Sequence, residues 1–176
     1  SPTNPVIFED CRVPASAILG ELNDGFRIAV AELTGGRIGI GSLALGVASA
    51  AMDYASQYIT ERQQFDTKIS DFHGIQWMLA DTYTELEAAR LLLMNAAYLK
   101  ENDLPFAKQA SMAKLYATEA ANRACYTAIQ LMGGLGYTEE VPLERYARDV
   151  RVTSIYEGTS EIQRVIIARE ILKEIA

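Results

Sequence analysis

The chain has 176 residues, of which 49% are hydrophobic and 22% are charged, so it is long enough for one domain with a substantial core. Its formal net charge of -7 argues against nucleic acid or an anionic membrane surface as the main partner. With two cysteines far apart and a single histidine, the chain lacks the ligand patterns of zinc and multi-histidine metal sites, and a reducing compartment fits it best.

The first 23 residues are predicted to form an extended segment. Val6-Ile7-Phe8 and Cys11-Arg12-Val13 have the composition of short strands, and no later stretch offers a strand to pair with them. Because the unpaired edge of a strand is usually covered in a native protein, we interpret this segment as part of a sheet whose other strands are absent from this chain. A plain extended arm lying on the helices is the alternative.

A long helix is predicted over residues 26–62, with an interruption near Gly35 and Gly36. The residues expected on its inner face are Leu43, Val47, Ala50, Tyr54 and Tyr58. The apolar run 38–52 is shorter than the roughly 20 residues that span a bilayer. We therefore expect a buried helix and no membrane span.

Two further long helices and a short one are predicted. The second long helix covers residues 71–101, after a basic and aromatic turn at 62–66, and the third covers residues 105–132 and begins with a proline, which suits a first helical turn. Small residues form the predicted inner stripe of the third helix: Ala110, Ala113, Ala117, Ala120, Ala124, Ala128 and Leu131. A glycine cluster at 133–136 ends this helix, and a short helix begins near Pro142.

The last helix is predicted to begin at a capping box formed by Ser160 and Gln163. Its apolar residues at helical spacing are Ile162, Val165, Ile166, Ile171 and Leu172. The patterns together predict an all-α fold: an antiparallel four-helix bundle with an extra short helix over residues 24–176, preceded by the short extended segment 1–23.

A carboxylate and a glycine stand directly before this last helix. Gly158, next to Glu157, has no side chain to prevent another molecule from approaching the free N–H groups of the helix start, which can donate hydrogen bonds to an anion or an enolate oxygen. The same residues also fit an ordinary loop-to-helix junction, in which Glu157 only complements the helix dipole. Position alone leaves both interpretations open.

Five motifs in register resemble the carboxy-terminal domain of flavin-dependent acyl-CoA dehydrogenases. They are Leu33-Thr34-Gly35-Gly36-Arg37-Ile38, Arg62-Gln63-Gln64-Phe65, Gln130-Leu131-Met132-Gly133-Gly134-Leu135-Gly136-Tyr137, Arg148-Asp149 and Tyr156-Glu157-Gly158-Thr159-Ser160-Glu161-Ile162-Gln163-Arg164. The resemblance covers the whole chain, and the GGRIGI and YEGTSEIQ strings favour the short-chain branch. It implies that residues 1–23 are the tail end of a missing β domain and that residues 24–176 are the carboxy-terminal helical domain.

The resemblance also implies the chemistry. Glu157 matches the base that removes the α-proton of an acyl-CoA thioester while a hydride leaves the β-carbon for FAD, which gives a trans-2-enoyl-CoA. Some branches carry the base at the position that is Gly36 here, where this chain has no carboxylate. The family holds the thioester oxygen with a flavin ribityl hydroxyl and the backbone N–H of the base, and it requires no metal.

Cofactor and substrate contacts follow from the same motifs. The implied cofactor-binding residues are Arg62, Phe65, His73, Gln130, Gly133, Gly134, Thr159 and Glu161. Among them, Arg62 and Phe65 face the flavin of a neighbouring subunit, whereas Thr159 and Glu161 contact the flavin of their own subunit. The implied substrate-binding residues are Thr34, Gly36, Arg37, Tyr156 and Gly158.

Three positions depart from the family pattern. Asp66 replaces the glycine that usually follows the Arg-x-x-Phe motif, His73 stands where a flavin-contacting glutamine is common, and Thr34 stands where short-chain members often carry aspartate. These departures affect the local turn and the flavin and CoA contacts, but not the base.

The implied partners are an acyl-CoA substrate, an electron-transfer flavoprotein as electron acceptor, and further copies of the same subunit in a dimer or tetramer. The family works in fatty acid β-oxidation, in the bacterial cytoplasm or the mitochondrial matrix. A non-catalytic helical domain that serves for assembly is the alternative. Because two domains that hold most of the flavin are absent from the sequence, this chain alone is expected to be inactive.

Overall fold

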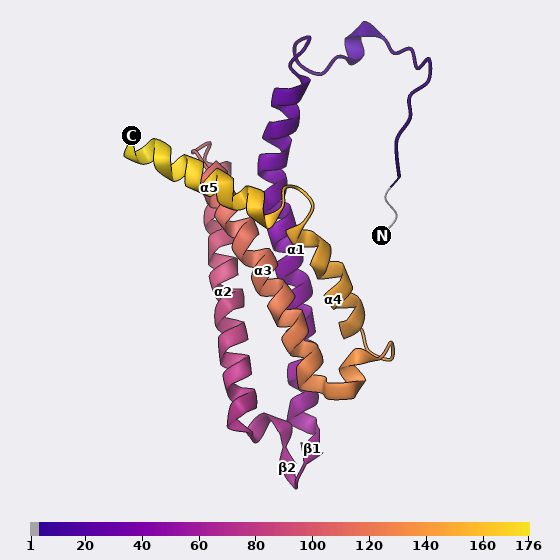
Figure 1. Ribbon diagram of the computed structural model, residues 1–176, viewed down its shortest axis with the longest axis vertical. Helices are drawn as coiled ribbons and strands as arrows, with labels where there is room; N and C mark the ends of the chain where they lie inside the picture. Colours follow the sequence, from indigo (N-terminus) through magenta and orange to yellow (C-terminus); the bar gives the residue numbers. More distant parts are fainter. Residues whose placement is uncertain (1–3) are drawn as a thin grey trace. The chain divides into compact units, whose positions relative to one another are not determined.

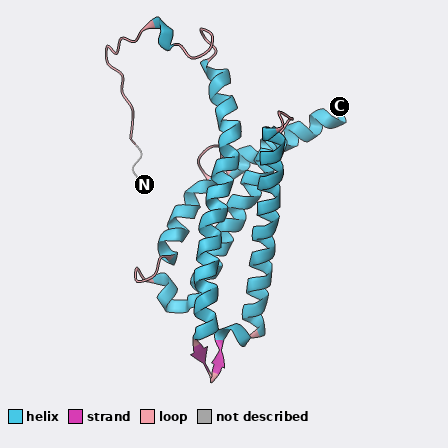
Figure 2. Ribbon diagram, turned by 180° about the vertical axis from the view of Figure 1, so that it is seen from behind, coloured by secondary structure: helices cyan, strands magenta, loops and turns pink. Residues whose placement is uncertain are grey.

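The computed structural model describes residues 4–176, which form helices and one small hairpin (Figures 1 and 2). The chain divides into two compact units, Ser1–Glu32 and Leu33–Ala176. Helices account for most of the described residues, so the predicted all-α class is confirmed.

The first unit contains little regular structure before its helix. A 3-10 turn, η1, covers Ala15–Ala17, and no strand forms within residues 4–24. A strand requires a partner, and the two predicted strand segments have none among the described residues. Val6, Ile7 and Phe8 are accordingly exposed. The assignment of this segment to a β domain stays a prediction, and its first three residues lie outside the described part.

Helix α1, Gly25–Glu61, is continuous, so the predicted interruption near Gly35 is wrong. Glycine lowers helix stability by about 1 kcal/mol, an amount that tertiary packing easily offsets. The predicted inner face is also largely wrong, because Leu43, Ala50 and Tyr54 are exposed. The residues that α1 does bury are mostly small: Arg37, Gly41, Ala44, Leu45, Ala48, Ala51, Met52, Ala55 and Ile59.

Close helix approach explains which face of α1 is buried. A Cβ added to Gly41 would lie 2.6 Å from Cδ2 of Leu93, so a side chain at this position would crowd the contact between α1 and α2. Of the described helices, only α1 is long and apolar enough to cross a membrane by length and composition. Its buried residues from Ala44 to Ile59 belong to the hydrophobic core, as they do in the core helix of a globular protein.

Helices α2, His73–Glu101, and α3, Ala107–Met132, pack against each other, and α3 also packs against α4 and α5. The predicted small-residue stripe of α3 is confirmed, because all seven of its members are buried. Between α1 and α2, strands β1, Gln63–Gln64, and β2, Thr67–Lys68, form an antiparallel hairpin. The short 3-10 turn η2, Ile69–Asp71, leads into α2.

The remaining elements follow α3. They are η3, Gly133–Tyr137; α4, Leu143–Arg151; η4, Val152–Ser154; and α5, Ser160–Ile175. In both views α5 crosses one end of the α2–α3 pair and does not run alongside it (Figures 1 and 2). An antiparallel four-helix bundle is therefore not confirmed. Several predicted apolar residues of α5 are exposed, including Ile162 and Leu172 at 49% and 65%.

Candidate active site

The loop between η4 and α5 has a strained backbone. Glu157 has a φ of 55° and Gly158 a φ of 89°, so two successive residues occupy the left-handed region. For a residue with a Cβ, such as Glu157, this conformation costs about 1–2 kcal/mol. It persists only where the surrounding structure holds it.

The start of α5 differs from the prediction by one residue. Thr159, not Ser160, is the N-cap, and its hydroxyl accepts a hydrogen bond from the Ile162 N–H at 3.3 Å. Ser160 instead donates a hydrogen bond to Oε1 of Glu119 on α3 at 2.6 Å. The predicted capping box is wrong because Ser160 and Gln163 both bond to groups outside the first helical turn.

A buried lysine on α3 holds the loop. Lys114 is 0% exposed, and its Nζ donates hydrogen bonds to the carbonyl oxygens of Tyr156 at 3.0 Å and Gly158 at 2.7 Å. These two residues flank Glu157 in the sequence. Hydrogen bonds from an ammonium group are roughly twice as strong as neutral ones. Lys114 therefore fixes the backbone on both sides of Glu157.

A glutamine on α5 holds the same loop from the other direction. Nε2 of Gln163 donates to the carbonyl oxygen of Gly158 at 2.9 Å and, more weakly, to that of Glu157 at 3.4 Å. A Cβ added to Gly158 would lie 2.7 Å from this nitrogen. Gly158 is thus required both by its positive φ and by the proximity of Gln163.

The side chain of Glu157 lies against α1. A Cβ added to Gly36 would overlap Oε2 of Glu157. This oxygen is buried and has no hydrogen-bond partner among the described residues. The position at which this chain has glycine in place of a carboxylate therefore lies directly beside the predicted base.

Arg37, next to Gly36 on α1, is buried at 8% exposure. Its Nη1 donates to Oγ of Ser111 at 3.3 Å, and its Nε has no partner among the described residues. Burial lowers the pKa of the Arg37 guanidinium, and attraction to Glu157 opposes this effect. A buried guanidinium with a free N–H can bind a further acceptor.

Two buried cations thus interact with Glu157. Burial also lowers the pKa of the Lys114 ammonium, while the nearby charges of Glu157 and Glu119 raise it and that of Arg37 lowers it. Burial raises the pKa of Tyr156, and the negative charge of Glu157 raises it further. The carboxylate therefore lies in a desolvated setting with cations on α1 and α3.

A polar pocket of about 270 Å³ lies at the N-terminus of α5. Its lining residues are Glu119, Asn122, Arg151, Ser154, Ile155, Thr159, Ser160 and Glu161. The pKa of Glu161 is lowered, chiefly because its own backbone N–H and the Thr159 hydroxyl donate to the carboxylate. Hydroxyl, amide and carboxylate groups fit a polyhydroxy or heterocyclic ligand such as part of a flavin, and the two carboxylates make a free phosphate a poorer match.

The other predicted cofactor-binding residues lie at the opposite end of α2 and α3, near the hairpin (Figure 1). They are Arg62, Phe65, His73, Gln130, Gly133 and Gly134. Phe65 is 89% exposed at the hairpin tip, and Arg62 forms no ion pair with the described residues. A Cβ added to Gly133 or Gly134 would meet no atom within 4 Å. This exposed group could contact the polar groups of a cofactor from outside the chain.

The predicted substrate-binding residues lie around Glu157, away from the hairpin. Gly36, Arg37, Tyr156 and Gly158 surround Glu157, and Thr34 is half-buried on the same helix as Gly36. The structure therefore separates the predicted residues into a group around Glu157 and the α5 N-terminus and a group around the hairpin.

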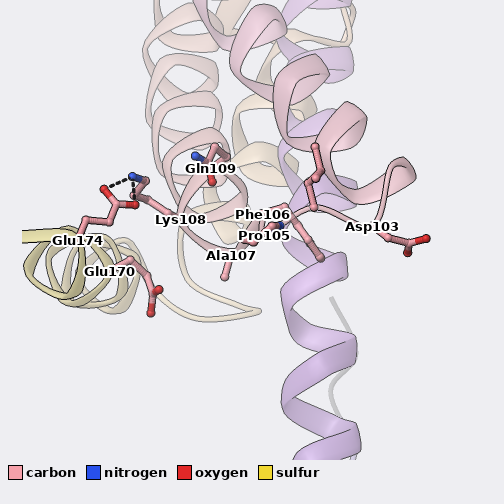
Figure 3. Close-up of a pocket in the computed structure, with 9 residues that line it drawn as sticks. Asp103, Pro105, Phe106, Ala107, Lys108, Gln109, Glu170 and Glu174 are labelled. Atoms are coloured by element: carbon pink, nitrogen blue, oxygen red, sulfur yellow. Dashed lines mark hydrogen bonds and ion pairs between the residues drawn. The ribbon is translucent and has the colours of Figure 1, made fainter.

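A further cavity, near another charged cluster, contains none of the predicted residues. It measures about 440 Å³ at the start of α3 and is lined by Asp103, Leu104, Pro105, Phe106, Ala107, Lys108, Gln109, Glu170 and Glu174 (Figure 3). Lys108 pairs with Glu174 at its edge. Among residues 4–176, no group of three or more His, Cys, Asp or Glu side chains is arranged to hold a metal ion.

The sequence interpretation missed Lys114 and Gln163. A lysine within the small-residue stripe of α3 was the available signal, because a charged residue next to Ala113 and one turn before Ala117 lies on the buried face of the helix. Gln163 was noted only as a capping residue. Their actual partners are loop carbonyls, which no local pattern reveals.

Comparison with known proteins matches residues 23–172 to a family described as "Acyl-CoA dehydrogenase, C-terminal domain". The mitochondrial short-chain specific acyl-CoA dehydrogenase of Rattus norvegicus is 51% identical over 173 residues, which cover 98% of this chain and 42% of that protein. The structure of butyryl-CoA dehydrogenase from Megasphaera elsdenii is similar with a TM-score of 0.92 and 43% identity, over 94% of this chain and 43% of that one. A structure described as "Electron transferring flavoprotein of Acidaminococcus fermentans" matches with a TM-score of 0.93 and 45% identity, over 94% and 44% of the two chains. The chain thus spans less than half the length of these relatives.

Proposed function

The chain belongs to the acyl-CoA dehydrogenase family as its carboxy-terminal domain, and we propose that it supplies Glu157 as the catalytic base of a flavin-dependent acyl-CoA dehydrogenase. The observation that carries the proposal is the buried Oε2 of Glu157, which has no partner among the described residues and belongs to a loop held by Lys114 and Gln163. A carboxylate oxygen kept free of internal hydrogen bonds is available to accept a proton.

The chain's own residues would act in two ways. The Glu157 carboxylate accepts the α-proton of the acyl-CoA thioester, and the Glu157 backbone N–H donates to the thioester oxygen as negative charge develops there. A bound FAD would supply the acceptor for the hydride from the β-carbon, and the product would be a trans-2-enoyl-CoA.

The flavin contacts are proposed to involve two subunits. Thr159 and Glu161, at the polar pocket of about 270 Å³, would contact the flavin of the same subunit. The hairpin group, with its exposed Phe65 and unpaired Arg62, would contact the flavin of a neighbour. The wide separation of the two groups in Figure 1 supports this division and hence a dimer or tetramer.

A short acyl-CoA is the proposed substrate, because the rat relative is named as a short-chain specific enzyme. The proposed electron acceptor is an electron-transfer flavoprotein, since one matched structure bears that description. The proposed location is the bacterial cytoplasm or the mitochondrial matrix, in fatty acid β-oxidation. Relatives of both origins are known: the rat protein is mitochondrial, and another relative comes from Bacillus subtilis.

Glu157→Gln in the full-length enzyme tests the assignment. Glutamine keeps the shape of the side chain but cannot accept the α-proton, so we expect flavin reduction by acyl-CoA to slow by about 10²–10⁴, the usual effect of losing a general base. FAD and acyl-CoA should still bind. Anaerobic stopped-flow absorbance at the flavin band measures binding and reduction separately.

Glu161→Gln is the matched control, four residues further on. Glu161 lines the polar pocket, so its loss should change flavin affinity without a comparable loss of rate. If Glu157→Gln reduces the flavin at nearly the wild-type rate, the base lies elsewhere and the alternative of a non-catalytic assembly domain gains support.

A further inference from the structure

We propose that Lys114 is a positioning residue for the base: it holds the backbone on both sides of Glu157 and places a positive charge near the carboxylate. This proposal rests on the proposed function of Glu157. It deepens that function by adding a residue on α3 on which the rate of proton removal depends.

The burial of Lys114 is unusual, because its neighbours on the helix are small apolar residues. Its neighbours on the inner face of α3 are alanines, including Ala113 and Ala117, and lysine is 0% exposed there. Burying an ammonium group is costly unless it is well hydrogen-bonded. Both of its bonds run to the loop, to Tyr156 and Gly158, and none of the ion pairs among the described residues includes it.

Those two bonds act where the backbone is strained. Glu157 and Gly158 both have positive φ, and the carbonyls that accept from Lys114 lie on either side of Glu157. Without the lysine, only Gln163 among the described side chains would hold this segment. A base must be held within a fraction of an ångström of its working position, because a displacement of about 1 Å can cost 100-fold in rate.

The charge of Lys114 is the second part of its role. The charged and titratable groups that interact with Glu157 are Arg37 on α1, Lys114 on α3 and the adjacent Tyr156. Glu119, also on α3, attracts Lys114 as well. If the lysine is replaced by a neutral residue, Glu157 keeps one neighbouring cation instead of two.

Lys114→Met in the full-length enzyme removes the donor and the charge but keeps the length of the side chain. We expect flavin reduction to slow by about 10- to 100-fold, with acyl-CoA affinity within about threefold of wild type. Stopped-flow flavin reduction over a range of acyl-CoA concentrations measures the rate and the affinity separately.

Two further variants separate the charge of Lys114 from its hydrogen bonds to the loop. Lys114→Gln keeps one donor and a polar side chain but no charge, so it should restore only part of the rate. Gln163→Leu removes the neutral hydrogen bonds to the same loop, so it should lower the rate less than Lys114→Met does. Lys114→Gln also serves if Lys114→Met fails to fold.

Lys108→Met is the matched control on the same helix, because Lys108 is paired with Glu174 away from the loop. It should change neither the rate nor the acyl-CoA affinity. The proposal is overturned if both Lys114 variants reduce the flavin at the wild-type rate, or if their acyl-CoA affinity falls in parallel with the rate, which would indicate a purely structural role. If Glu157→Gln also leaves the rate unchanged, the proposed function itself fails. If Glu157→Gln slows flavin reduction but Lys114→Met does not, only the proposed role of Lys114 is rejected.

Discussion

The chain contains two turns that each have two successive residues at positive φ, and their support is very different. At the hairpin tip, Phe65 and Asp66 have φ of 53° and 58°, and in the site loop Glu157 and Gly158 have φ of 55° and 89°. The hairpin turn is exposed and is closed by strands of two residues each. The site loop is instead held by a buried lysine and a buried glutamine from two helices.

This difference indicates which part of the proposed cofactor site is complete within the chain. A strained loop that the fold holds from two sides is preorganised for chemistry. An exposed aromatic residue beside an unpaired arginine, as with Phe65 and Arg62, provides binding groups without internal partners. Substitutions in the site loop should therefore alter the stability and geometry of the chain. Substitutions in the hairpin should alter only the binding of its ligand.

Arg62→Ala in the full-length enzyme is the largest expected effect on the hairpin side. We expect FAD retention to weaken by about 1.5–3 kcal/mol, the scale of a hydrogen bond to a charged group. The free energy of unfolding of the 176-residue chain should change by less than about 0.5 kcal/mol, because Arg62 is exposed and unpaired. Flavin content after dialysis and urea unfolding measure the two quantities.

Lys68→Ala, in the opposite strand of the hairpin, is the control for Arg62. Lys68 is also exposed, but no motif assigns it to the flavin, so its loss should leave flavin content unchanged. Equal flavin loss in both variants would mean that the hairpin contributes only general positive charge.

Gly158→Ala tests the supported turn. Alanine at a φ of 89° costs about 1–2 kcal/mol, and its Cβ would also crowd Nε2 of Gln163. We expect the free energy of unfolding to fall by that amount in urea titrations. Gly134→Ala is the matched control, since a Cβ there meets nothing within 4 Å. A Gly158→Ala variant as stable as Gly134→Ala would show that the fold does not constrain the site loop.

The sequence predicted the structural features that depend on local patterns. The stripe of small residues on α3 follows helical periodicity, and all its members are buried. The inner face of α1 was mispredicted because large apolar residues such as Leu43 and Tyr54 were given more weight than the glycines and alanines that permit close approach. The hairpin strands were missed because two-residue strands carry no alternating pattern.

Prediction of the candidate site was limited in a similar way. The motifs placed Glu157, Gly158 and Gly36 together, and the structure brings them into contact. The motifs could not identify Lys114, because its partners are backbone carbonyls more than 40 residues away in sequence, and main-chain acceptors leave no mark in the residue types. Such support becomes visible only when the helices are packed.

The smallest expected effect is that of Asp66→Gly, in the unsupported hairpin turn. A two-residue hairpin turn with positive φ at both positions favours glycine, most strongly at its second position. Aspartate tolerates this region better than most residues, and glycine also gains entropy in the unfolded chain, so the two effects partly cancel. We therefore expect the free energy of unfolding of the 176-residue chain to rise by only a few tenths to about 1 kcal/mol, measured by urea titration.

Asp71→Gly is the control for this change, because Asp71 is also exposed but lies outside the positive-φ residues. Glycine brings no conformational relief there and only adds freedom to the unfolded chain, so this variant should be slightly destabilised. If Asp66→Gly raises the free energy of unfolding and Asp71→Gly lowers it, the backbone at the hairpin tip is strained, and the rest of the chain does not relieve that strain. Equal losses of stability would mean that a φ of 58° costs Asp66 little free energy. The supported and the unsupported turn would then differ only in burial.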